Sequence, residues 1–219
     1  MEKLIKKPSE EIYEIEFSGQ FIPEKLSPLW FANKKLLGKK EARQAKIVNI
    51  YEGSHCSFKT EFLEIYIQPH RFRILSKNLN SYDLVNDMGI SIAKILEDSL
   101  YDDFYLNLKL HYTFPSDETL AKMLNKLHNT NQWNEIFDSN QLHAIQLFNF
   151  NETETYMQKT LLSISPCDRT DMQHTTHLFI KNHFHRNPEN SSIVSILESN
   201  EHRIDSSIIL ANKIIKKYF

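Results

Sequence analysis

Hydrophobic and polar residues alternate along several short segments of this sequence. Tyr13, Ile15 and Phe17 alternate with Glu14 and Glu16. Successive side chains of a β-strand point to opposite faces, so this period of two predicts a strand with one buried face. Runs rich in apolar, β-branched and aromatic residues predict further strands at 46–51, 56–68, 72–76, 105–114, 143–150, 156–165 and 174–185.

A second periodicity, of three to four residues, predicts helices. Ser81 is expected to cap the first long helix, with Asp83 in its first turn. Pro115 and Ser116 mark the start of a second helix, and 41–46 is expected to be a short one. The apolar stripes are Leu84, Val85, Met88, Ile92, Ile95 and Leu96 in the first helix, and Ile204, Ile208, Ala211, Ile215 and Tyr218 in the closing helix.

The order of these elements defines the expected fold class. Strands come in consecutive groups, each followed by a helix, which differs from the strand–helix alternation of a parallel sheet. We therefore predict an α+β protein, with an antiparallel sheet and helices packed on one face, in a single domain spanning 1–219. Segments 12–128 and 141–219 each run from strands to a long helix, which suggests two pseudo-repeated halves, although they share no motif.

Composition and charge mainly exclude certain classes of protein. The 219 residues include 26 Lys and Arg against 28 Asp and Glu, a formal net charge of −2. This balance gives no global attraction to nucleic acid, which is therefore not an expected partner. No apolar run approaches the roughly 20 residues that a membrane-spanning helix needs. Its 4 glycines stand alone, which excludes a glycine-rich phosphate loop.

Two further features predict a cytoplasmic location. Residues 1–14 are charged and lack the apolar core of a signal peptide. Cys56 and Cys167 are far apart and form no Cys-x-x-Cys pair, which suggests a reducing compartment and no disulfide framework.

Four stretches together resemble a sporadically distributed bacterial family. Segment 21–47 reads FIPEKLSPLWFANKKLLGKKEARQAKI and segment 71–76 reads RFRILS. Asn182–Phe184 reads NHF, and segment 201–219 reads EHRIDSSIILANKIIKKYF. The resemblance covers nearly the whole chain. Members of this family are cytosolic and have no established activity, so the resemblance implies a fold and little chemistry. Families with such a sporadic distribution often lie beside defence or toxin–antitoxin genes.

The segment 21–37 concentrates large apolar residues without a clear period. Two prolines keep it from forming a long helix or a central strand. It either covers the core of the sheet or forms a contact surface for a partner chain. Trp30, Phe31, Leu29 and Leu26 are the candidate interface residues, since Trp in particular is enriched at the energetic centres of interfaces.

Two His-x-Thr triplets on predicted strands are candidates for catalysis. His111 and Thr113 belong to the first triplet, and His174 and Thr176 belong to the second. The pair resembles the signature of the 2H phosphoesterases, in which two histidines act as general acid and base on a phosphodiester while the hydroxyls hold its oxygens. The leucine that usually follows the hydroxyl residue is absent here. The alternative is that both threonines are ordinary β-branched strand residues.

A His-x-His pair is the candidate metal site. His183 and His185 share one face of the strand predicted at 174–185, about 6–7 Å apart. Two imidazoles can bind one zinc or iron ion, but such a site needs a third ligand. The alternative is a polar, solvent-facing strand.

These observations lead to a first interpretation of function. We expect a non-catalytic accessory protein that works through contacts with a protein partner, or with a second copy of itself as a homodimer, and that needs no cofactor. The alternative is a small 2H-like phosphodiesterase, or an enzyme dependent on a divalent metal, that uses the strand histidines.

Overall fold

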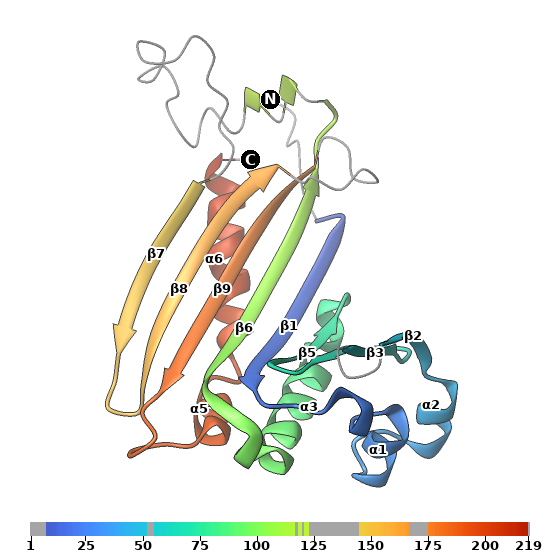
Figure 1. Cartoon of the computed structure of the whole chain (residues 1–219). Coiled ribbons are helices and arrows are strands. Elements are labelled where there is room, and N and C mark those ends of the chain that lie inside the picture. Colours follow the sequence, from blue (N-terminus) through green and yellow to red (C-terminus); the bar gives the residue numbers. More distant parts are fainter. Residues whose placement is uncertain are drawn as a thin grey trace.

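A computed structural model describes residues 8–51, 55–116, 118–119, 121–122, 145–166 and 175–218. Within these residues the strands form one antiparallel sheet, in the order β2-β3-β4-β5-β1-β6-β9-β8-β7 (Figure 1). The strands are β1 (Glu10–Gly19), β2 (Lys46–Tyr51), β3 (His55–Lys59), β4 (Glu64–Gln68), β5 (Arg71–Ser76), β6 (Leu100–Thr113), β7 (Ile145–Glu152), β8 (Tyr156–Pro166) and β9 (Thr175–Arg186). The predicted α+β class with an antiparallel sheet is confirmed.

The described helices lie on one side of this sheet. They are α1 (Pro28–Asn33), α2 (Lys39–Gln44), α3 (Tyr82–Ile95), α5 (Ile193–Ser199) and α6 (Arg203–Tyr218), with short 3₁₀ turns at Pro23–Lys25, Leu79–Ser81 and Glu97–Ser99. Figure 1 shows α3, α5 and α6 behind the long strands. Among these described helices, none has the length and apolar character needed to cross a membrane.

Period-two alternation explains why the helices gather there. Tyr13, Ile15 and Phe17 of β1 are 1% exposed or less, and they point toward the helices. Ile15 lies directly under Gly89 of α3, where a Cβ would stand 2.7 Å from its Cδ1 atom. Phe31 of α1 packs against Phe58 and Phe72 on the same side of the sheet.

The opposite side of the sheet is called the outer face here. Residues that pair across neighbouring strands share a face, so the register assigns its members. Glu14 and Glu16 lie on it, between the helix-facing residues of β1. Asn107 and Lys109 of β6 and Lys181 of β9 continue it across the centre of the sheet. The charged positions of the sequence pattern are thus gathered on one surface.

The pseudo-repeat of the two expected halves is not confirmed. Strand β6, from the first half, pairs with β1 on one side and with β9, from the second half, on the other. Strands of both halves therefore belong to one continuous sheet, and a duplication is not confirmed.

Two local predictions were wrong. The segment 56–68 is divided into β3 and β4 by a turn, in which the Thr60 N–H donates to the Leu63 carbonyl (2.8 Å) and Thr60 Oγ1 accepts from the Leu63 N–H (3.2 Å). Ser81 does not cap α3 with its side chain. The 3₁₀ turn Leu79–Ser81 leads straight into this helix, so Ser81 lacks the extended backbone of a capping residue.

Candidate functional site

The candidate interface residues divide between the core and the surface. Leu26 and Phe31 are 5% and 0% exposed, so they belong to the core. Trp30 is partly buried and packs edge-on against Phe31, with ring centres 5.1 Å apart. Leu29 is 65% exposed. Of the four, Leu29 therefore offers most of its side chain to a partner.

Helix α1 holds Leu29 in this position. Ser27 precedes the helix in extended conformation, and its hydroxyl oxygen accepts the N–H of Trp30 at 3.4 Å. Pro28 occupies the first helical position, where its fixed φ angle suits a helix and its missing N–H costs nothing. Because Phe31 is anchored in the core, the opposite side of this short helix carries Leu29 outward.

A groove of about 660 Å³ lies beside Leu29. Helices α1 and α2 and the beginning of β2 form its walls, and most of its lining is apolar. Ile47 of β2 is 52% exposed within it. The lining residues are Ser27, Pro28, Leu29, Ala32, Asn33, Lys39, Ala42, Arg43, Ala45 and Ile47.

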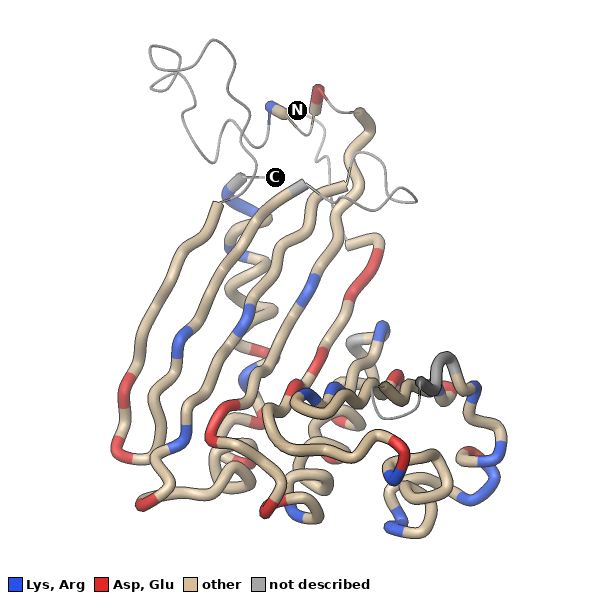
Figure 2. The backbone as a smooth tube through the Cα atoms, in the orientation of Figure 1, with Lys and Arg blue, Asp and Glu red and all other residues tan. Residues whose placement is uncertain are grey.

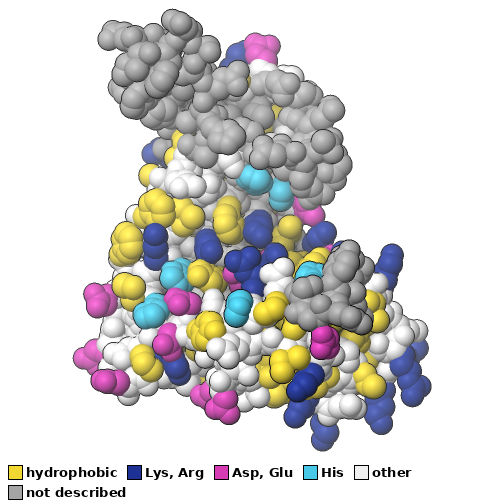
Figure 3. Space-filling model, viewed as in Figure 1, with side chains coloured by type: hydrophobic (Ala, Val, Ile, Leu, Met, Phe, Trp, Pro, Cys, Tyr) yellow, Lys and Arg dark blue, Asp and Glu magenta, His cyan; other side chains and the backbone are white. Residues whose placement is uncertain are grey.

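The surroundings of this groove are basic. Lys39 and Arg43 line it and are exposed, and neither forms an ion pair with a residue that the structure describes. Lys34 at the end of α1, Lys40 of α2 and Lys46 of β2 are also exposed. Figure 2 shows Lys and Arg positions gathered beside α1 and along α2, and Figure 3 shows Lys and Arg side chains projecting from that end of the molecule. This local charge contrasts with the formal net charge of −2 for the whole chain.

Strand β2 forms one end of the described sheet. It pairs with β3 alone, with a register shift between Ile47 and Asn49. The other edge of β2 has no neighbouring strand among the described residues.

The candidate metal residues share a carboxylate on the outer face. Nε2 of His183 lies 2.6 Å from Oδ1 of Asp103, and Nδ1 of His185 lies 3.1 Å from the same oxygen. Partial burial would raise the pKa of Asp103, but the two histidine hydrogen bonds outweigh it and lower that pKa. Across the residues that the structure describes, no group of three or more His, Cys, Asp or Glu is arranged to hold a metal ion.

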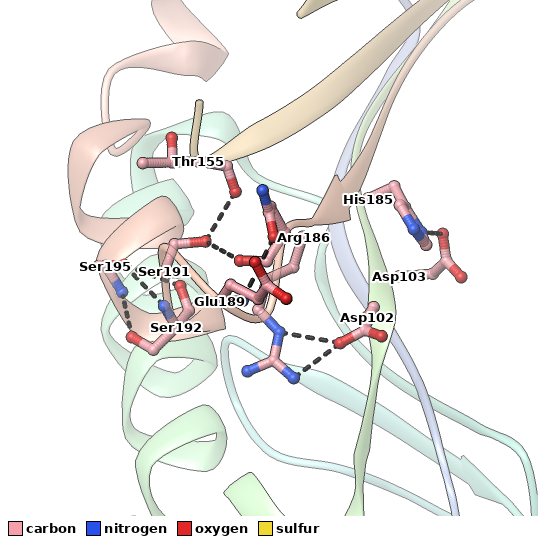
Figure 4. A network of polar contacts seen from close by, with 10 residues as sticks. Asp102, Asp103, Thr155, His185, Arg186, Glu189, Ser191, Ser192 and Ser195 are labelled. Atoms are coloured by element: carbon pink, nitrogen blue, oxygen red, sulfur yellow. Dashed lines mark hydrogen bonds and ion pairs between the residues drawn. The ribbon is translucent and has the colours of Figure 1, made fainter. Parts of the chain in front are cut away.

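Figure 4 shows that residues at the start of β6 and the end of β9 belong to two separate networks of polar contacts. Asp103 contacts His185 on one side, while Asp102 accepts two hydrogen bonds from Arg186, at 2.7 and 2.9 Å, on the other. Beyond them, Ser192 and Ser195 form the capping box that begins α5. These contacts hold the start of β6 against the end of β9 and begin α5, so we interpret this network as structural.

The candidate catalytic threonines lie on opposite faces of the sheet. Thr113 pairs with Thr175, and their hydroxyl oxygens are 3.1 Å apart. Thr176 is fully buried on the helix side, and its hydroxyl donates to the carbonyl of Ser165 at 2.6 Å. The expectation that both hydroxyls face one cleft is therefore wrong. His111 lies beside His177, with ring centres 5.4 Å apart, and His174 lies outside the described residues.

Sequence reasoning missed the charge network at the centre of the outer face. Glu14 is 1% exposed and accepts a hydrogen bond from Asn107 at 2.8 Å. Its other oxygen is bonded to Arg73 and lies 3.5 Å from the ammonium group of Lys109. Burial would raise the pKa of Glu14, but these two cations and hydrogen bonds lower it overall. The partners come from two other strands, β5 and β6, so only the register reveals the cluster.

No protein-family model matches the sequence, and a search of curated proteins finds none similar to it. Functional inference therefore rests on the geometry of the groove and of the outer face.

Proposed function

We propose that this chain is a non-catalytic binding protein, and that the groove between α1, α2 and β2 holds an extended, acidic segment of a partner protein. The observation that carries the proposal is the combination of two half-exposed aliphatic side chains, Leu29 and Ile47, with unpaired cations around one groove.

The apolar lining supplies a reason for binding. Leu29 and Ile47 expose 65% and 52% of their surface beside Pro28, Ala32 and Ala42. Covering such side chains releases about 25 cal/mol per Å² of apolar surface removed from water. The small alanines leave room for the side chains of an incoming segment, which can enter as alternate residues of a strand.

The edge of β2 supplies a backbone template. An extended peptide that pairs with a free sheet edge gains main-chain hydrogen bonds, and neighbouring pockets select its side chains. Such a peptide would lie along β2 and place apolar residues against Ile47 and Leu29.

The basic residues select the charge of the partner. Lys39 and Arg43 favour a segment that carries Asp or Glu beside its apolar residues. The same cations disfavour a symmetric homodimer through this groove, because a two-fold interface would bring two basic patches together. We therefore favour a different protein over a second copy.

The alternative enzymatic function has less support in the geometry. Thr113 and Thr176 point to opposite faces, and the two metal candidates, His183 and His185, both bond to Asp103. An acid–base pair needs its groups to converge on one substrate.

The test uses fluorescein-labelled peptides of defined sequence. Each alternates leucine with either aspartate or lysine, and binding is measured by fluorescence polarisation. We expect the acidic series to bind and the basic series to fail. Ile47→Asp is expected to weaken binding at least about ten-fold, since it places a charge on the apolar surface and repels the acidic peptide.

Ile209→Asp is the matched control. Ile209 of α6 is 54% exposed, against 52% for Ile47, and lies outside the groove. This variant should bind the acidic peptides as the parent chain does. Equal binding of both peptide series, or unchanged binding by Ile47→Asp, would contradict the proposal. A dimer in sedimentation equilibrium that Ile47→Asp dissociates would instead identify a second copy as the occupant.

A further inference from the structure

The outer face carries lysines seated on aromatic rings. On the β7–β8 pair, Nζ of Lys159 lies 4.5 Å from the ring centre of Phe148 and 5.6 Å from that of Phe150. These two rings belong to the edge strand and are 50% and 65% exposed. Large exposed apolar rings on a sheet face indicate a contact surface when they lie together.

The same arrangement continues on the next two strands. Nζ of Lys181 on β9 lies 3.9 Å from the ring centre of Tyr105 on β6. Nζ of Lys109 on β6 lies 5.4 Å from the ring centre of Phe179 on β9. We call this set the lysine–aromatic band; it comprises Phe148, Phe150, Lys159, Phe179, Lys181, Tyr105 and Lys109. Figure 3 shows the Lys and Arg side chains gathered at the centre of this face, between hydrophobic and histidine side chains.

Two of the three lysines of the band lack an ion-pair partner among the described residues. Glu14 and Glu16 of β1 are buried, and they form ion pairs with Arg71, Arg73 and Lys109. Lys159 and Lys181 form no ion pair with any residue that the structure describes. Burial is the largest effect on Lys181 and lowers its pKa, while Glu16 and Glu14 raise that pKa and Arg71 and Lys109 lower it.

We propose that the lysine–aromatic band binds single-stranded nucleic acid. Its backbone phosphates would contact Lys159 and Lys181, and its bases would stack on the exposed rings of Phe148 and Phe150. Alternation of cations with aromatic rings on an open surface is the combination that single strands require, since every base has a face that stacks. Unpaired bases can reach such rings, whereas the bases of a duplex stay within their own stack.

The inference differs from the expectation drawn from net charge. A formal charge of −2 removes long-range attraction, but contacts within the Debye length of about 8 Å depend on local groups. The local groups here are the unpaired Lys159 and Lys181. Binding is therefore expected to be short-range, and strongest at low ionic strength.

The test measures fluorescence anisotropy of a labelled oligothymidylate at several salt concentrations. For two phosphate contacts, the logarithm of the association constant should fall with that of salt with a slope near −1.4, at about 0.7 per phosphate of a single strand. Replacing both Lys159 and Lys181 with alanine should weaken binding at least about ten-fold and flatten this slope. Phe150→Ala should weaken it at least about five-fold, because a stacked base is lost.

Controls separate this surface from simple charge and from the groove. Lys213→Ala removes an exposed lysine of α6, on the helix side, and should leave binding unchanged. Ile47→Asp should also leave it unchanged, so failure of the groove proposal and failure of this one are distinguishable. Absence of oligonucleotide binding at low salt would overturn the inference. So would equal affinity for duplex DNA, or binding of anionic lipid vesicles in its place.

Discussion

The buried carboxylate of Glu14 offers the sharpest test of the outer-face geometry. It is 1% exposed, and it joins β1 to β5 through Arg73 and to β6 through Asn107 and Lys109. Glu14→Gln keeps the shape of the side chain and removes its charge. The substitution leaves two cations without their shared anion at the centre of the sheet.

The expected cost is about 2 kcal/mol in the free energy of unfolding, within the range for hydrogen bonds to charged groups. A fully buried pair would cost about 3–5 kcal/mol, but the side chains of Arg73 and Lys109 are 28% and 30% exposed and keep partial contact with water. For a chain of this size, 2 kcal/mol corresponds to a fall of about 4–8 °C in Tm.

The pH dependence has a definite sign. Because the folded-state pKa of Glu14 is lowered, its stabilisation is present above the unfolded-state pKa and is lost as pH falls through the folded-state value. Wild type should therefore lose its advantage over Glu14→Gln in acid. Urea unfolding followed by circular dichroism at neutral and acidic pH measures this difference. Glu24→Gln, on an exposed glutamate, is the control and should stay within about 0.5 kcal/mol. A deficit that persists unchanged in acid would refute the reasoning.

Two further predictions concern packing. Gly19→Ala should lower the free energy of unfolding in urea by about 1–3 kcal/mol, because the added Cβ would collide with the Ser99 carbonyl. Gly38→Ala is the control and should be tolerated, since its Cβ would lie 3.9 Å from the nearest neighbouring atom. Equal effects of the two substitutions would contradict this prediction. Phe31→Ala should cost about 3–5 kcal/mol, whereas Leu29→Ala should stay within about 0.5 kcal/mol; a small loss at Phe31 would show that it is not a core residue.

The local pattern of apolar and polar residues was sufficient to predict most strands, because the alternation of a strand is a property of residues that are adjacent in the chain. The alternation at 13–17 lies within β1, and β2 occupies the segment expected at 46–51. The turn between β3 and β4 was missed since it contains no Gly, Pro or Asn; Thr60 closes it with its own hydroxyl. Without those residues, 56–68 resembles one continuous strand.

The sites depended on register, which local pattern does not contain. Thr113 pairs with Thr175, so Thr176, one residue further, points to the other face. A shift by one position would have brought Thr113 and Thr176 to the same side. Likewise, the composition shows lysines and aromatics in ordinary numbers, and only the pairing of β6 with β9 places Lys181 over Tyr105.

The two proposed surfaces lie on different parts of the strand order, which leads to a final prediction. From β2 to β6, the nearest strand of the lysine–aromatic band, there are five strand-to-strand steps in the described sheet, or roughly 24 Å along it at about 4.8 Å per step. Sites so far apart, with no shared side chain, should bind independently. We therefore expect a saturating acidic peptide to change oligonucleotide affinity less than about two-fold. Titration of labelled oligothymidylate with and without the peptide measures this coupling. A larger change would show either that the sheet couples the two sites or that the two ligands share one surface. Ile47→Asp distinguishes these cases. If the surfaces are separate, this variant weakens binding of the peptide and leaves binding of the oligonucleotide unchanged.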